Sequence, residues 1–331
     1  MRKWFLLFGA SVLAVACGAR TGLDVPSFHD AGSEGGSGSG GSAFLPDAGP
    51  DADADAPPDV PDVIDAAPDV PIDVPPPLDC QEAGITYIYV ITEENDLYRF
   101  YPPDLSFTFI GTIACPTLGA GQPFSMAVDR KGKAYVVFSA PENDPDNGRL
   151  FEVSTANAAC KATTFMQGQS DFTNTFGMGF SADTSDPDET LFVVGEGDPE
   201  PLASIDVDTF NLNLIGSFNS SIGNSELTGT GDGRLFAFGI DQTQLHGHLA
   251  EIDKTNANVK TDLVLATVGT GTTVAWAFAF WGGDFFFFTS SGQGSSIVTR
   301  YQPESGQETD VAKLDKTIVG AGVSTCAPQS F

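Results

Sequence analysis

The stretch Leu249-Ala250-Glu251-Ile252-Asp253-Lys254-Thr255-Asn256 is the clearest of five related segments in this chain. In each segment apolar and polar residues alternate, and a cluster of turn-forming residues follows, which is the pattern of a short strand entering a hairpin. The other four segments begin at Leu97, Leu150, Leu202 and Val298. Successive copies lie roughly 50 residues apart, a period that is typical of repeat architectures.

Each repeat predicts four antiparallel strands. In the second repeat we expect strands, from innermost to outermost, at 124–129, 134–139, 150–154 and 161–165. Innermost strands recur at 177–180, 226–230, 276–280 and 320–324, and second strands recur at 87–90, 191–194, 235–238 and 285–288. Each series has five members, so the sequence predicts an all-β fold, a five-bladed β-propeller.

The two ends of the series predict how the ring closes. The first repeat lacks an innermost strand, whereas 320–324 is an innermost strand with no repeat after it. Pairing 320–324 with 87–90 closes the ring by strand exchange between the termini and leaves no long unpaired edge. Cys80 and Cys326 then flank the junction, which predicts a disulfide between them.

The other two cysteines of the predicted folded part, Cys115 and Cys160, are paired by default. The expected strand positions support this pair less directly, because Cys115 follows an outermost strand while Cys160 precedes one. The connection 116–123 has to bring them together. The four cysteines lack the C-x-x-C spacing of zinc sites, which favours two disulfides in an oxidising compartment.

Residues 1–16 have the basic start, apolar run and small-residue end of an export signal. The apolar run is too short to span a bilayer as a helix. The segment Leu13-Ala14-Val15-Ala16-Cys17 resembles a bacterial lipobox, although alanine stands at the position where the usual pattern has leucine. That resemblance implies cleavage before Cys17, a lipid anchor on it and, from Gly18, export to the outer membrane. The alternative is ordinary cleavage after Ala16 and a soluble secreted protein.

Residues 17–79 are expected to form a disordered tether. A Gly/Ser-rich part is followed by repeated Pro/Asp/Val units, and 24–79 hold thirteen acids with no Lys or Arg. Ordering such a segment costs backbone entropy with little apolar burial in return. The run Asp51-Ala52-Asp53-Ala54-Asp55 superficially matches a calcium loop but lacks its glycine and its closing glutamate, which favours a solvated spacer. The folded domain is therefore expected over 80–331.

The charge of the chain excludes one class of partner. The net charge is −29, and residues 80–331 carry 12 basic against 31 acidic side chains, so −19. A field of this sign repels phosphate backbones, so we expect no nucleic-acid partner. Divalent cations would be attracted, but we expect no cofactor, with calcium as a weak alternative.

Candidate catalytic residues are scarce. Glycosidases use facing carboxylates, which a propeller would place on its innermost strands, but those strands offer Glu226 alone. His246 and His248 lie on one side of an extended segment, and zinc needs a third ligand that the folded part does not supply as histidine. The acidic turns 142–148 and 183–189 are expected to be solvated loops rather than calcium sites. We therefore expect no enzyme.

Two groups of residues are candidates for a ligand face. The acids that follow innermost strands at equivalent places would form a ring at one mouth; these are Asp129, Asp183, Asp232 and Asp284. The role favoured for such acids is instead to accept backbone N–H bonds in tight turns. Trp276 and Trp281 belong to the densest aromatic cluster, which would stack against a sugar or fill the space between blades. Trp281 is the ring whose exposure would distinguish the two.

Three features together carry a resemblance: the start Cys17-Gly18-Ala19-Arg20-Thr21-Gly22-Leu23, the acidic tether, and blades containing the stretches 124–129 and 275–284. They resemble uncharacterised bacterial β-propeller lipoproteins with an acidic Pro/Asp-rich tether. The resemblance implies a lipid-anchored outer-membrane protein facing the periplasm or the cell surface, and it implies no site residues. We predict a module that binds a protein or a glycan outside the cytoplasm. The alternatives are a hydrolase or lyase acting on a carbohydrate or lactone, and a structural coat component.

Overall fold

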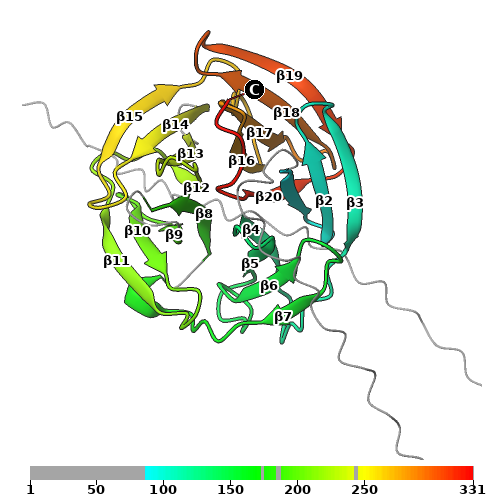
Figure 1. The fold of residues 1–331 in the computed structure, drawn as a ribbon. Helices are drawn as coiled ribbons and strands as arrows, with labels where there is room; N and C mark the ends of the chain where they lie inside the picture. The colour runs from blue at the N-terminus through cyan, green and yellow to red at the C-terminus, as the bar shows by residue number, and fades with distance from the viewer. Residues whose placement is uncertain (1–85, 173–174, 184–187, 242–244, 331) are drawn as a thin grey trace, which may run out of the picture. The chain divides into compact units, whose positions relative to one another are not determined.

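The computed structural model describes residues 86–330 except 173–174, 184–187 and 242–244. Within these residues twenty strands form five four-stranded sheets around a common centre (Figure 1). Blade 1 holds β20 (Ile318–Val323), β1 (Ile88–Thr92), β2 (Asp96–Tyr101) and β3 (Ser106–Thr112); blade 2 holds β4 (Gln122–Val128), β5 (Lys133–Ser139), β6 (Leu150–Ser154) and β7 (Cys160–Ala162). Blade 3 holds β8 (Phe176–Ala182), β9 (Glu189–Gly195), β10 (Pro201–Ile205) and β11 (Leu212–Ser217); blade 4 holds β12 (Asn224–Gly229), β13 (Leu235–Asp241), β14 (His246–Ile252) and β15 (Val259–Val264); blade 5 holds β16 (Ala275–Trp281), β17 (Asp284–Ser290), β18 (Ser296–Gln302) and β19 (Gln307–Leu314).

The predicted five-bladed propeller is thus confirmed, and the described residues contain no α-helix, only the 3-10 turn η2 (Gln169–Asp171). Most predicted strands differ from the observed ones by one to three residues at an end. The prediction that extends furthest beyond its observed strand is 161–165, because β7 stops at Ala162. There the Thr163 hydroxyl donates to the Leu150 carbonyl oxygen at 2.8 Å, and the chain leaves the sheet.

The ring closes as predicted, because β20 pairs antiparallel with β1 from Ile88↔Val323 to Thr92↔Ile318. The innermost strands of neighbouring blades then pack backbone against backbone. A Cβ added at Gly322 would lie 2.9 Å from the Ala127 carbonyl carbon of β4, so only glycine allows this approach. The innermost strands of blades 1 and 2 therefore lie in direct backbone contact.

The aromatic run Phe285-Phe286-Phe287-Phe288 supplies two blade interfaces at once. Successive side chains of a strand point to opposite faces of its sheet. Phe285 and Phe287 contribute to a cluster with blade 4, in which Phe287 and Phe238 have ring centroids 4.6 Å apart. Phe286 and Phe288 pack instead against Phe100 of blade 1, both at 5.8 Å. The aromatic cluster that the sequence singled out is inter-blade core.

The repeated stretch owes its pattern to a turn in which one residue adopts a left-handed conformation. That residue lies five positions after the fourth residue of each copy: Leu105, Ala158, Phe210, Ala257 and Gly306, with φ of 57°, 61°, 57°, 63° and 69°. In the copy at 249–256, Asp253 Oδ1 accepts the Thr255 N–H at 2.9 Å and thereby fixes the turn. Each copy marks the hairpin between the third and the outermost strand.

The Cys115–Cys160 disulfide is present, which confirms that prediction. Cys115 follows the outermost strand of blade 1, and Cys160 begins the outermost strand of blade 2. They meet because the connection that leaves one blade lies against the beginning of the next blade's outermost strand. The same place is fastened by Gln169 Oε1 and the Leu212 N–H at 3.0 Å between blades 2 and 3. Between blades 3 and 4, Asn219 Oδ1 accepts the Val259 N–H at 2.8 Å.

The second predicted disulfide is only partly within the described residues. Cys326 is disulfide-bonded, whereas Cys80 lies outside the described residues. The signal segment 1–16, the lipidation candidate Cys17 and the tether 17–79 lie outside them as well. Among the residues that are described, no helix has the length and apolar character needed to cross a membrane.

Candidate functional site

The four candidate aspartates lie at one face of the ring. Because neighbouring strands are antiparallel, the turn after each innermost strand and the turn after each third strand belong to the same face. A direct contact shows this in blade 2, where the Thr155 hydroxyl donates to the Gly132 carbonyl oxygen at 2.5 Å. We call this side the aspartate face. The opposite side, which carries the connections between blades and the turns after the second strands, is the loop face.

Asp129 serves its own turn. It is 6% exposed, and its Oδ1 accepts the N–H groups of Lys131 at 2.9 Å and Lys133 at 2.8 Å. Burial raises the pKa of Asp129 above its ordinary value, against these hydrogen bonds. This is the turn-forming role that the sequence favoured for this residue.

The other three aspartates also have protein partners. Asp232 accepts a hydrogen bond from the Thr230 hydroxyl, and Asp284 pairs with the Arg300 guanidinium. Asp183 accepts the Thr190 hydroxyl at 3.1 Å and lies 3.8 Å from Lys254 Nζ. The four acids are thus used in separate places, and within the described part of the chain no three His, Cys, Asp or Glu side chains are arranged to hold a metal ion.

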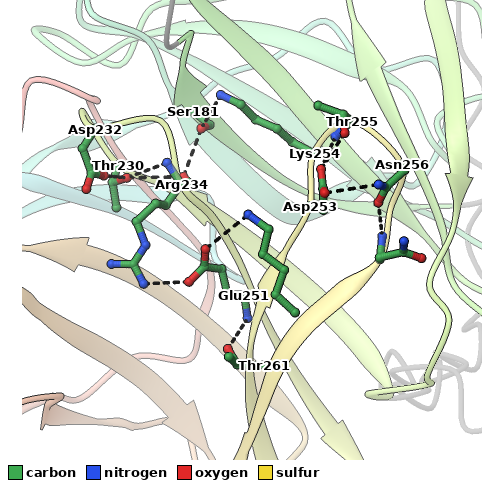
Figure 2. Close-up of polar contacts among 12 residues, drawn as sticks. Ser181, Thr230, Asp232, Arg234, Glu251, Asp253, Lys254, Thr255, Asn256 and Thr261 are labelled. Atoms are coloured by element: carbon green, nitrogen blue, oxygen red, sulfur yellow. Dashed lines mark hydrogen bonds and ion pairs between the residues drawn. The ribbon is translucent and has the colours of Figure 1, made fainter.

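Lys254, which belongs to the repeated stretch, reaches from blade 4 across to blade 3 (Figure 2). Its Nζ donates to the Ala182 carbonyl oxygen at 2.5 Å and to Ser181 Oγ at 3.3 Å. The Ser181 hydroxyl donates in turn to the Arg234 carbonyl oxygen at 3.0 Å. Burial lowers the pKa of Lys254 from its ordinary value, against the attraction of Asp183. This lysine fastens two blades together at the aspartate face.

Glu189 belongs to a turn that was expected to be solvated, but its side chain is only 11% exposed and forms a cluster with Arg130 and Thr325 that sequence reasoning missed. Glu189 Oε1 accepts the Arg130 N–H at 2.6 Å, and Oε2 accepts the Thr325 hydroxyl at 2.7 Å. The Arg130 Nε donates to Thr325 Oγ1 at 2.6 Å. Burial raises the pKa of Glu189 to about 7, helped by nearby Asp129 and opposed by the hydrogen bonds. The three residues come from blade 2, blade 3 and the C-terminal segment, so no local pattern could bring them together.

The C-terminal segment after β20 lies over the centre of the aspartate face (Figure 1). Beyond Thr325, the Gly282 N–H donates to the Pro328 carbonyl oxygen at 2.8 Å, which fixes the segment to the β16–β17 turn. A Cβ at Gly231, in the β12–β13 turn, would lie 2.5 Å from the Thr325 carbonyl oxygen. The segment therefore touches the inner turns of blades 4 and 5 as well as Glu189 of blade 3.

Neither candidate tryptophan is open to solvent. Trp281 is 5% exposed, and its Nε1 donates to the Thr86 carbonyl oxygen at 3.0 Å. Trp276 is 4% exposed, and its Nε1 donates to the Asn224 carbonyl oxygen at 3.1 Å. Because both rings are enclosed, neither offers a surface for a sugar to stack on, and the inter-blade alternative describes them better.

The other candidates for chemistry are also engaged within the fold. Glu226 is 3% exposed on β12 and accepts a hydrogen bond from Ser125 of β4. His248 Nδ1 lies 2.9 Å from Asp262 Oδ1 on the neighbouring strand. The acidic turn 142–148, which was expected to be a solvated loop, contains Asp146, and Asp146 is completely buried. That expectation is wrong for Asp146, because its oxygens bind the loop at 116–121.

No protein-family profile matches the sequence, and no curated protein matches it. Among solved structures, the chain is similar to one in a nidogen/laminin complex, with a TM-score of 0.44 at 12% identity over 75% of this chain and 100% of that one. It is also similar to TolB from Acinetobacter baumannii (TM-score 0.41, 11% identity, 70% of this chain and 54% of that one). An engineered GH43 glycoside hydrolase gives 0.42 at 9% identity over 57% of this chain and 40% of that chain.

Proposed function

We propose that this chain is an envelope-anchored lipoprotein, held through Cys17, whose propeller binds a protein or a glycan outside the cytoplasm. The observation that carries the choice of binding over catalysis is how the propeller uses its candidate acids. Each of Asp129, Asp183, Asp232 and Asp284 is engaged by groups of the protein itself. Hydrolysis of a glycosidic bond requires two carboxyl groups facing one substrate, and this arrangement does not supply them.

One observation favours the alternative, a carbohydrate- or lactone-processing hydrolase or lyase. A carboxyl group with a pKa near neutrality suits general acid–base work, and the pKa of Glu189 is raised to about 7. The same carboxyl group, however, already accepts hydrogen bonds from Arg130 and Thr325. A substrate would have to displace the C-terminal segment to reach it.

The binding function is tested with the mature full-length protein on a glycan array and by cross-linking in intact cells, alongside an assay for reducing ends released from a panel of polysaccharides. Binding without turnover supports the proposal. Turnover by the wild type that is lost in Glu189→Gln, while the thermal midpoint stays unchanged, would support the hydrolase and overturn the proposed binding function.

The anchor is tested separately. Metabolic labelling with a fatty acid should mark the wild-type chain and not Cys17→Ser, and the variant should leave the membrane fraction. A labelled Cys17→Ser chain, or an unlabelled wild type, would contradict the lipid anchor without touching the binding function.

A further inference from the structure

Three loops on the loop face of blade 2 are joined into one structure, which we call the platform and define as residues 116–121, 141–149 and 165–168. Its centre is Asp146, which is completely buried. Asp146 Oδ1 accepts the Leu118 N–H at 3.0 Å, and Oδ2 accepts the Gly119 N–H at 2.6 Å. Asp144 adds a bond from the Ala120 N–H at 3.1 Å. The first two loops are therefore fixed to each other by carboxylates that point inward.

The third loop is attached to the same turn. Gln167 Nε2 donates to the Pro145 carbonyl oxygen at 2.9 Å. Arg149 pairs with Asp146 at 3.0 Å and also donates to the Pro116 carbonyl oxygen at 3.0 Å. The Cys115–Cys160 disulfide holds the chain immediately before the first loop. Loops bound in this way lose little further freedom when a partner docks, which favours affinity.

The platform displays apolar side chains to solvent. Leu118 and Met166 are each 72% exposed, more than any other large apolar side chain among the described residues. Leu118 donates its own N–H to Asp146, and Met166 precedes the residue that binds Pro145, so both adjoin one turn. Pro116, Pro141 and Pro145 of the same loops are exposed as well. Neutral, apolar centres with methionine are characteristic of protein interfaces.

We propose that the platform is a docking surface for a folded protein that presents an apolar pocket rimmed by Lys and Arg. The basic rim follows from charge complementarity. Residues 80–331 carry 12 basic against 31 acidic side chains, so −19, and Glu142 of the platform is exposed. This inference rests on the proposed binding function and names its partner class.

The same features argue against the other occupants. Glycan sites rely on exposed aromatic faces, and the described platform residues include no exposed aromatic side chain. Anionic lipid and a second copy of this acidic domain are both repelled by its charge. Thr86, the first described residue, binds Trp281 on the aspartate face, which is the side away from the platform.

The experiment uses the full chain in its native cells, with a photo-cross-linking residue in place of Leu118, of Met166 or of Leu214. Leu214, on β11 of blade 3, is 56% exposed and serves as the matched control. We expect the same protein adduct from positions 118 and 166 and none from 214. The purified adduct partner should then bind Leu118→Glu or Met166→Glu at least about tenfold more weakly than wild type. Its binding to Leu214→Glu should be unchanged, and added salt should weaken its binding to the wild type.

Each other outcome is decisive. A protein adduct from 214 alone would overturn the platform and leave the binding function standing. A glycan, lipid or self adduct at 118 and 166 would overturn the partner class. The absence of any adduct at all three positions would count against the platform and, if the glycan array is also silent, against the binding function. Unchanged thermal midpoints of the glutamate variants exclude loss of folding as the cause.

Discussion

Glu189 and Thr325 are separated by 136 residues, yet Glu189 Oε2 accepts the Thr325 hydroxyl at 2.7 Å. One carboxylate thus ties the C-terminal segment to blade 3 at the aspartate face. Thr325 is 2% exposed and also receives the Arg130 Nε–H at 2.6 Å. Protonation of the Glu189 carboxyl group therefore affects how firmly the C-terminal segment is held.

Glu189 predicts a fall in stability with rising pH. Its pKa is raised from 4.5 to about 7 in the folded protein, so the folded state holds the proton more tightly than the unfolded state. The contribution is fully present below pH 4.5 and is lost as the pH rises through 7; it amounts to about 3 kcal/mol for this shift. Glu189→Gln stays neutral, so urea unfolding at pH 5 and pH 8 should show a smaller decline than in wild type.

The exposed acid Glu142 provides the control for that comparison, because Glu142→Gln should keep the wild-type decline. An equal decline in Glu189→Gln and wild type would show that Glu189 does not carry the pH dependence.

Asp146 predicts a large loss on truncation. Asp146→Ala leaves the N–H groups of Leu118 and Gly119 without their buried acceptor, and Arg149 without its ion pair. We expect a loss of about 3 kcal/mol in the free energy of unfolding, measured by urea titration. Asp315→Ala, in a side chain that is 83% exposed, should cost less than about 1 kcal/mol. A similar, small cost for both variants would contradict the central role of Asp146.

The hydrogen bonds also make the Asp146 contribution depend on pH. Although burial opposes them, bonds from Leu118, Gly119 and Arg149 hold the pKa of Asp146 below its ordinary value of 3.8. Its stabilisation is therefore present above that value and is lost as the pH falls through the folded-state pKa. The free energies of unfolding of Asp146→Ala and wild type should therefore differ less in strongly acidic buffer than at neutral pH.

The disulfide between blades 1 and 2 predicts a loss of stability when it is removed. Its cysteines are 45 residues apart, so the bond restricts the unfolded chain over a long loop. Cys115→Ala combined with Cys160→Ala should lower the free energy of unfolding by about 2–4 kcal/mol. The denaturant midpoint measures this, and a midpoint within error of wild type would show that neighbouring hydrogen bonds suffice.

The repeated left-handed turn residue predicts a position-specific effect of alanine. Gly306 has φ of 69°, and an added Cβ would meet no atom within 4 Å, so only backbone strain is tested there. Gly306→Ala should cost about 1 kcal/mol in thermal unfolding. Glu304→Ala, two residues earlier in the same exposed turn, should cost much less. The reverse order of the two would contradict the strain argument.

The fold could be read from the sequence because its information is local and repeated. Leu249 to Asn256 carries strand alternation and turn chemistry within eight residues, and the same signal recurs in every blade. Closure could be read too, since 320–324 had no repeat after it. The Trp276 and Trp281 rings show the limit, because the residues that cover a side chain come from other blades.

The candidate site was harder to predict for the same reason. Asp129 and Asp183 were candidates because they follow innermost strands at equivalent positions. In the structure Asp129 binds backbone N–H groups of its own turn, and Asp183 lies beside Lys254 of the next blade. Asp146 looked like one acid among several in a solvated turn. Its burial depends on the loop at 116–121, which is 28 residues away at Leu118, and no periodicity encodes that contact.

The pairing of Ile88 with Val323 has a consequence for biosynthesis. The strand that begins at Ile88 pairs with one that ends at Val323, about 235 residues later, so this sheet stays incomplete until β20 has been made. Long-range pairing of this kind makes the final step slow and leaves a hydrogen-bonding edge open meanwhile. A chain held open in this way stays unfolded longer than one in which every strand pairs with a close neighbour in sequence.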